Sequence, residues 1–234
     1  MKKQIQNHWW LLVLPLLLVA ACKNGDTNPG MKYKGKDLYL DYRVKAVQDR
    51  DNVSCFFQFR ENGPNGKPVL LTTPAKISFD GEQLTADSAG MSGIFYEVLL
   101  PLNGFKGNHS IIYADAAGKE FREEFVFQPV DFSSEMPSVI SRQNFSIQLT
   151  GLAAEDYLHI VATDTSFYSN DLNQLDTLQD GLLKMAPGQL TELVNGPITL
   201  IIYYEQKRSL KSPTKAGGSL WTTYSLQRDF ELRN

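Results

Sequence analysis

The sequence predicts an all-β protein built from two β-sandwich modules, and three observations support this. Apolar and polar residues alternate with a period of two in many short runs, while helical periodicity is almost absent. Gly, Asn, Asp and Pro bound these runs, as is typical of turns. The alternation stops at the polar stretch 131–137 and then starts again. We therefore expect one module at 37–130 and a second at 131–234.

The first module has the clearer strand pattern. Strands are expected at 38–46, 53–60, 77–79, 94–100, 109–114 and 121–127. Asp80-Gly81 is a strong signal for a two-residue hairpin turn. Cys55 falls in phase with the apolar residues of its strand, which indicates a small buried core residue and not a reactive thiol.

The second module repeats the pattern with longer interruptions. Strands are expected at 145–149, 157–163, 182–185, 198–204 and 220–232. The acidic stretch 164–180 is expected to be a long loop, and Ser212-Pro213 with Gly217-Gly218 predicts another. Carboxylates in the first loop could hold a calcium ion, although their spacing matches no EF-hand and favours a solvated loop.

The N-terminal segment predicts export from the cytoplasm. Lys2 and Lys3 precede an uncharged, mainly apolar run at 9–21. This run is shorter than the roughly 20 residues that span a bilayer, and its length suits a signal peptide. We therefore assign residues 1–21 to a signal peptide.

Val19-Ala20-Ala21-Cys22 resembles the lipobox of bacterial lipoproteins. The resemblance implies cleavage before Cys22, acylation of that residue, and attachment to the membrane through its lipid. Lys23 in the next position implies sorting to the outer membrane, and Lys23 with Asp26 partly matches the surface-export signals of Bacteroidetes lipoproteins. Residues 22–36, rich in Gly, Asn and Lys, are then a flexible tether. The protein would be lipid-anchored in the cell envelope, facing the periplasm or the surface.

Two segments resemble bacterial immunoglobulin-like domains. GFKGNHSIIYADAAGKEFREEFVF (104–127) is similar to the last two strands of such a domain, with a lead-in through His109. LLKMAPGQLTELVNGPITLIIYYE (182–205) is similar to the same region of a second domain, where a helical turn leads into a long strand. The resemblance implies two tandem immunoglobulin-like β-sandwiches in a Bacteroidetes-type outer-membrane lipoprotein. It supports a fold and implies no activity.

The net charge and the small number of residues suited to catalysis or metal binding narrow the range of functions expected for this protein. Without its signal peptide the chain has 21 basic and 26 acidic side chains, which argues against nucleic acid as a partner. His109 and His159 stand alone, without the spacing of a metal site, so neither a metal nor another cofactor is expected. Glu123 and Glu124 are neighbours on a strand and point to opposite faces. We therefore expect no enzyme activity.

One pair of aromatic residues stands out as a candidate ligand-binding site. Trp221 is out of phase with the apolar residues of the last strand, and Tyr203 lies on the more polar face of the preceding strand. On a solvent-facing sheet they could stack a sugar ring or contact a protein. The alternative is that this face is covered and the rings only pack. The sequence thus predicts a non-catalytic interaction or structural module with an unknown protein or glycan partner; a glycan-binding lipoprotein of a polysaccharide-uptake system is the alternative.

Overall fold

The structure is a computed structural model that describes residues 37–234 except 49, 144, 154 and 167–169. It is all-β apart from one 3-10 helix at Pro187–Leu190, which confirms the predicted fold class. Within the described residues, no helix is long and apolar enough to cross a membrane. The predicted signal peptide, Cys22 and the tether 22–36 lie outside the described residues.

In the described part of the chain, sixteen strands form three sheets. The strands are β1 (Leu38–Val47), β2 (Asn52–Glu61), β3 (Lys76–Phe79), β4 (Glu82–Gln83), β5 (Ala86–Ala89), β6 (Gly93–Pro101), β7 (Gly107–Ala114), β8 (Glu120–Phe127), β9 (Asp131–Phe132), β10 (Val139–Ser141), β11 (Phe145–Thr150), β12 (Tyr157–Thr163), β13 (Leu172–Thr177), β14 (Leu182–Met185), β15 (Gly196–Thr214) and β16 (Gly217–Arg233). The largest sheet has nine strands in the order β13-β12-β15-β16-β1-β2-β6-β5, with β10 paired to β16. The smaller sheets are β4-β3-β7-β8 and β14-β11-β9.

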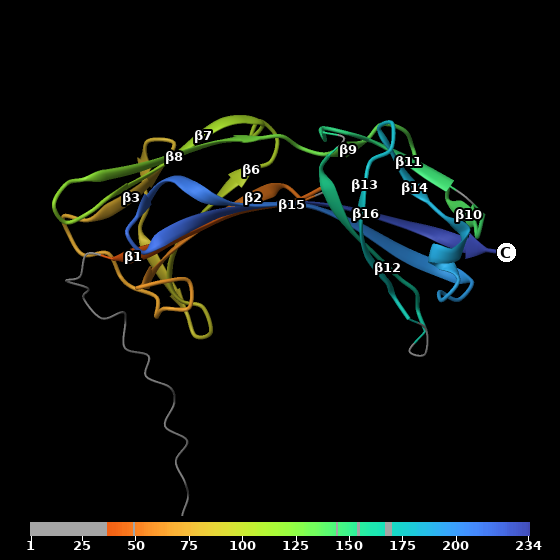
Figure 1. Ribbon diagram of the computed structural model, residues 1–234, viewed down its shortest axis with the longest axis horizontal. Coiled ribbons are helices and arrows are strands. Elements are labelled where there is room, and N and C mark those ends of the chain that lie inside the picture. Colours follow the sequence, from red (N-terminus) through yellow and green to blue (C-terminus); the bar gives the residue numbers. More distant parts are fainter. Residues whose placement is uncertain (1–36, 49, 144, 154, 167–169) are drawn as a thin grey trace, which may run out of the picture.

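The three sheets make two β-sandwiches that share the nine-stranded sheet. The four-stranded sheet covers one half of the nine-stranded sheet and the three-stranded sheet covers the other half. Both lie on the same, upper side in Figure 1, and the molecule is an arch with two lobes. We call these the first lobe, which contains β1–β8, and the second lobe, which contains β9–β14.

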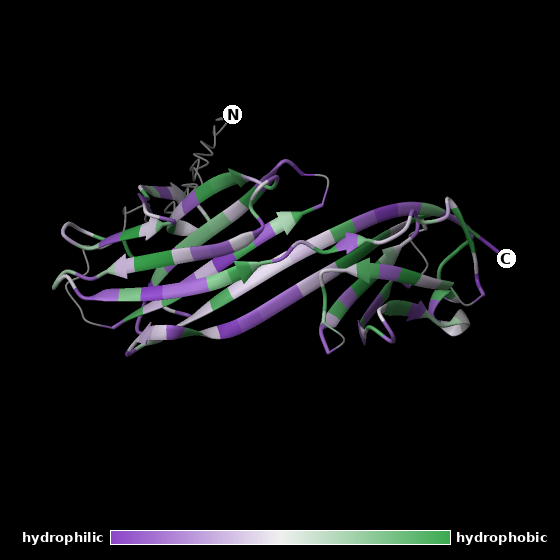
Figure 2. Ribbon diagram, turned by 90° about the horizontal axis from the view of Figure 1, so that it is seen from above, coloured by the Kyte–Doolittle hydropathy of each residue, from purple (hydrophilic) through white to green (hydrophobic). Residues whose placement is uncertain are grey.

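The hairpin β15–β16 belongs to both lobes. β15 pairs with β12 in the second lobe, while β16 pairs in parallel with β1 from Leu40↔Gly218 to Val47↔Ser225 in the first. A strand as long as β15 extends for about 60 Å, and Figure 2 shows both strands running uninterrupted from one lobe into the other. The division at residues 130 and 131 stays a prediction, and the structure adds that the C-terminal hairpin reaches back across it.

Two predicted loops are wrong. The expected loop through residues 212–218 is a tight hairpin tip, because β1 gives β16 a pairing partner from Gly218 onward and the Thr214 hydroxyl donates a hydrogen bond to the Leu38 carbonyl. The stretch 164–180 contains the strand β13, which pairs with β12 at the edge of the sheet. An edge strand without a fully buried face has little alternation, so the sequence gives it no clear signal.

Alternating residues build one continuous hydrophobic core that runs through both lobes. The inward-pointing residues of β1 and β2 are part of an aromatic cluster. In it the ring centres of Tyr42 and Phe57 are 5.4 Å apart, and those of Phe59 and Tyr113 are 4.9 Å apart. In the second lobe Leu158 and other aliphatic residues are fully buried. The turn at Asp80-Gly81 has positive φ at both residues, 48° and 89°, which confirms the predicted hairpin.

Cys55 is fully buried in the first-lobe part of the core, as its phase predicts. Burial raises the pKa of its thiol to about 12, with smaller contributions from Asp80 and Glu97. The folded protein therefore keeps the proton in a range where the unfolded chain, with an ordinary thiol pKa of about 8.5, releases it. The stability linked to this proton is complete below pH 8 to 9 and is lost as the pH rises towards 12.

We expect Cys55→Ala to reduce the alkaline loss of stability by up to about 1.4 kcal/mol per pH unit above pH 9. The measurement is the free energy of unfolding by urea at several pH values between 7 and about 11. The variant will itself be less stable at neutral pH, so the slope is compared and not the absolute value. Equal slopes in the two proteins would contradict the assignment.

Candidate functional site

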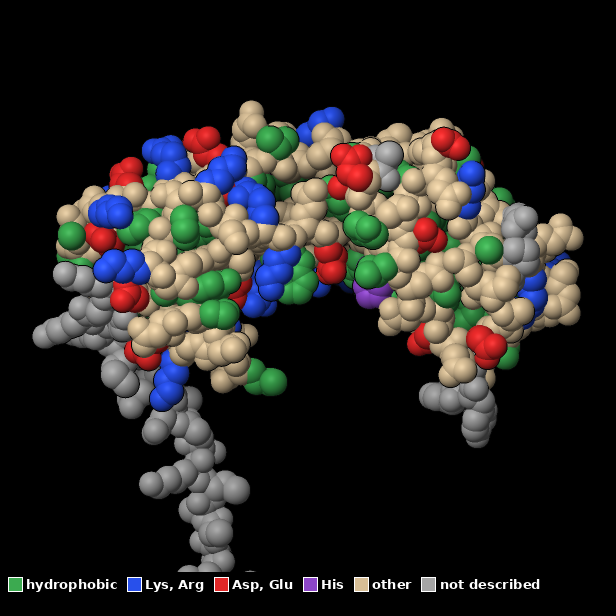
Figure 3. Space-filling model, viewed as in Figure 1, with side chains coloured by type: hydrophobic (Ala, Val, Ile, Leu, Met, Phe, Trp, Pro, Cys, Tyr) green, Lys and Arg blue, Asp and Glu red, His purple; other side chains and the backbone are tan. Residues whose placement is uncertain are grey.

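Within the described residues, no second layer covers the lower side of the nine-stranded sheet. The two smaller sheets both lie on its upper side, and Figure 3 shows the lower side as a hollow between the two lobes. The hairpin β5–β6 and the hairpin β12–β13 descend at its two ends (Figure 1). We call this lower side the open face.

One row of side chains crosses five strands of the open face. Strand register aligns, in order, Glu97, Phe56, Arg43, Trp221 and Lys207. The Arg43 guanidinium carbon lies 5.9 Å from the ring centres of both Phe56 and Trp221, and the Lys207 Nζ lies 5.2 Å from that of Trp221. Cations over aromatic faces at these distances are attracted by the ring quadrupole. From Phe56 to Lys207 the row therefore alternates aromatic and cationic groups, and the carboxylate of Glu97 ends it.

Trp221 and Tyr203 both lie on the open face, and both are partly exposed. Trp221 is opposite Lys207, whereas Tyr203 is opposite Ser225 and contacts His159, with 5.5 Å between the ring centres and an angle of 30° between the rings. Four residues separate the two positions along the hairpin, which is about 13 Å. The structure thus places both rings on one surface without bringing them into contact.

The indole nitrogen of Trp221 is buried and has no hydrogen-bond partner in the described part of the chain. An unsatisfied buried donor of this kind costs about 1–3 kcal/mol. The packing of the ring between Arg43 and Lys207 offsets part of this cost. The same packing leaves less of the ring exposed than the sequence alone suggests. Trp221 therefore packs against its neighbours and also exposes part of its ring on the open face.

Salt bridges and hydrogen bonds neutralise some charges of the open face and leave others free. Asp41 accepts two hydrogen bonds from Arg43, at 2.7 and 3.2 Å, and lies 3.6 Å from Arg60. The hydrogen bond to Asp41 raises the pKa of Arg43, against an opposing effect of burial. Two lysines are different: within the described residues, neither Lys45 nor Lys207 has a carboxylate within 4.0 Å.

Exposed apolar side chains gather at the two ends of the open face. Leu99 on β6 is 60% exposed, and Tyr157 and Leu175 on the other side are 67% and 70% exposed. Strand register puts Leu99 beside Ser54, and Leu175 beside His159, on this same side of the sheet. Exposed large apolar groups that converge on one surface are typical of an interaction site.

The sequence did not reveal Arg43, Lys45, Phe56 and Lys207 as members of the site. All four are out of phase with the buried residues of their strands, and that phase was visible in the alternation of β1 and β2. What was not visible is the parallel pairing of β1 with β16, which joins residues 178 positions apart, as in Arg43 and Trp221.

A second hollow lies on the upper side, between the four-stranded sheet and the hairpin. This cleft of about 680 Å³ is lined by β7, β8, β15 and β16. At its side Glu123, 2% exposed, is held by Arg208 at 2.6 Å and by the backbone N–H of Lys211 at 2.7 Å. His109 is bound on both ring nitrogens, by Asp80 and by the Phe105 carbonyl, as expected of a residue with a packing role.

The remaining carboxylates do not converge. Asp164 accepts hydrogen bonds from the backbone N–H groups of Ser166 and Val194, both at 2.7 Å, and Asp176 accepts one from Thr177. Across the described ranges, no three His, Cys, Asp or Glu side chains are grouped closely enough to hold a metal ion. Asp164 thus joins two loop segments, and Asp176 binds its neighbour on β13.

Comparison with known proteins finds no matching family model and no matching curated protein. Among solved structures, DIP-gamma IG1+IG2 aligns over 84% of this chain and 95% of its own, with a TM-score of 0.23 and 9% identity. The Bacteroides ovatus mixed-linkage glucan utilization locus SGBP-B, in complex with a mixed-linkage heptasaccharide, aligns over 86% and 46%, with a TM-score of 0.21 and 11% identity. A bacterial ice-binding adhesin aligns over 81% and 63%, with a TM-score of 0.21 and 10% identity. Similarities of this size carry no information about function.

Proposed function

We propose that this protein is a non-catalytic interaction module of the cell envelope, tethered to the outer membrane through lipid on Cys22, and that the open face is its binding surface. The observation that carries the proposal is the set of exposed apolar and aromatic side chains on the one side of the nine-stranded sheet that no second layer of the described residues covers. A sheet face without function is normally polar on its solvent side.

The test of the binding surface is photo-crosslinking in cells that make the full-length protein. A photoreactive amino acid replaces Thr223, which lies between β1 and β15 on the open face. A matched variant carries it at Val126, which is 68% exposed on the outer side of β8. We expect a crosslinked species from position 223 and none from position 126. Crosslinking from position 126 alone would reject the open face as the binding surface.

The tether is tested separately. Cys22→Ala is expected to abolish incorporation of a labelled fatty acid and to move most of the protein from the membrane fraction to the soluble fraction, because the acyl chains supply the membrane affinity. Cys55→Ala is the control, since this buried thiol is not accessible for acylation. A labelled, membrane-bound Cys22→Ala protein would disprove the lipoprotein assignment.

Glycan binding is a second candidate for the same surface. It is favoured by the positions of Trp221 and Tyr203, two partly exposed rings about 13 Å apart on one sheet face, with the partly exposed hydroxyl group of Thr223 between them. Aromatic faces can stack sugar rings while neighbouring hydroxyls bind their polar groups. Loss of glycan binding in Trp221→Ala, with folding retained by circular dichroism, would support this candidate, and unchanged glycan binding in that variant would count against it.

A further inference from the structure

We infer that the open face selects an acidic glycan, a polysaccharide that carries carboxylate or sulfate groups. The inference rests on the glycan-binding candidate above and adds the charge of the ligand. Its basis is the group of side chains around Trp221 at the middle of the arch, which we call the central patch. The central patch consists of Arg43, Lys45, Glu205, Lys207, Trp221 and Thr223.

The central patch is positively charged on a negatively charged protein. Residues 37–234 hold 17 of the 23 Lys and Arg and 25 of the 26 Asp and Glu of the chain. The central patch reverses this balance, with three cations and Glu205 as its one carboxylate. Asp41 beside it is 7% exposed and already bound by Arg43 and Arg60.

Lys45 and Lys207 are the cations of the central patch that no carboxylate neutralises within the described residues, and Lys207 lies over the ring of Trp221. Both lysines are exposed. They lie on either side of β16, on β1 and on β15, with Trp221 and Thr223 between them. A sugar ring stacked on the exposed part of Trp221 therefore lies within reach of ammonium groups from two directions. A carboxylate or sulfate on that ring would pair with them.

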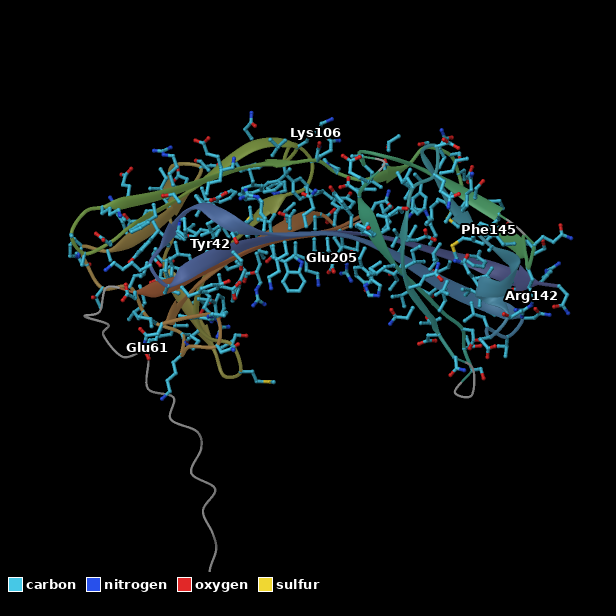
Figure 4. The ribbon with its side chains drawn as sticks, viewed as in Figure 1. Tyr42, Glu61, Lys106, Arg142, Phe145 and Glu205 are labelled. Atoms are coloured by element: carbon cyan, nitrogen blue, oxygen red, sulfur yellow. The ribbon has the colours of Figure 1, made fainter. Side chains whose placement is uncertain are left out.

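The shape of the open face favours a glycan over a flat membrane. The hairpins β5–β6 and β12–β13 descend on both sides of the central patch and hold it back from any flat surface (Figure 1). In Figure 4 Glu205 points from β15 into the hollow, on the opposite side of the sheet from Lys106. The strongly exposed apolar side chains lie at the ends of the hollow, whereas its middle carries charges, hydroxyls and single rings. This distribution suits a polar chain.

The experiment uses the mature chain from residue 22 with Cys22→Ser, in which Trp221 is the only tryptophan. Its fluorescence is titrated with a galacturonic acid hexamer and with a glucose hexamer. We expect a signal with the acidic hexamer, weakening as salt screens the ion pairs, and at least about tenfold weaker binding of the neutral one. Lys45→Ala/Lys207→Ala is expected to weaken binding of the acidic hexamer by about tenfold, and Glu205→Gln to strengthen it by about threefold.

The control variant removes two lysines from the upper side, Lys106→Ala/Lys184→Ala, and is expected to leave binding unchanged. Equal binding of both hexamers, with no effect of the Lys45 and Lys207 substitutions, would overturn charge selection while leaving glycan binding in place. Binding of neither hexamer would overturn this inference and the glycan candidate together. The same conclusion would follow if anionic phospholipid vesicles, and neither hexamer, bound through Lys45 and Lys207.

Discussion

Arg208→Ala is expected to lower the free energy of unfolding by about 3 kcal/mol, because it leaves a buried carboxylate without its cation. Glu123 is 2% exposed, and its partners are the Arg208 guanidinium at 2.6 Å and the N–H of Lys211. Arg208 also donates a hydrogen bond to the Glu124 carbonyl at 3.1 Å. These contacts close the side of the first sandwich between β8 and β15, so their loss also loosens the hairpin.

The measurement is equilibrium unfolding in urea, and Arg122→Ala is the matched control. Arg122 lies on the same strand as Glu123 and forms an exposed pair with Glu120 at 3.9 Å, so its removal is expected to change stability by no more than about 0.5 kcal/mol. The double variant Glu123→Leu/Arg208→Met should recover most of the loss, because apolar groups of similar size need no counter-charge. Equal effects of Arg208→Ala and Arg122→Ala would show that Glu123 does not depend on this pair.

The hairpin shared by the two lobes is expected to make them unfold together. Leu158 on β12 is fully buried in the second lobe and pairs with Tyr204 on β15. We expect Leu158→Ala to destabilise the protein by about 3 kcal/mol through the lost contacts and the cavity. Because β15 and β16 continue into the first lobe, this loss should also appear at Trp221, which faces β1 there.

The measurement compares two probes of the same thermal unfolding. Trp221 fluorescence reports the first lobe and far-ultraviolet circular dichroism reports both, and we expect one coincident transition that Leu158→Ala shifts equally in the two signals. Leu175→Ala, on the neighbouring strand and 70% exposed, is the control and should shift it little. A Trp221 transition that stays in place while the dichroism splits into two steps would show independent lobes.

The sequence by itself determined the fold class, most of the strands and which face of each strand is buried. A period-two pattern reports burial directly, because successive side chains of a strand point to opposite sides of the sheet. Hence the phase of Cys55 and the opposite phase of Trp221 were both correct. Exposed strands were harder: β13 has no fully buried face, and its pattern resembled a loop.

Only the tertiary structure decided which strands are neighbours. The set of side chains on the open face follows from those neighbours. Local pattern carries no information on pairing between positions as distant as those of β1 and β16, because that pairing depends on the packing of the whole sheet. The structure alone therefore brought Arg43 beside Trp221 and left Lys45 and Lys207 with no carboxylate of the described residues within 4.0 Å. The two aromatic residues were visible in the sequence, and the charges that surround them came from the fold.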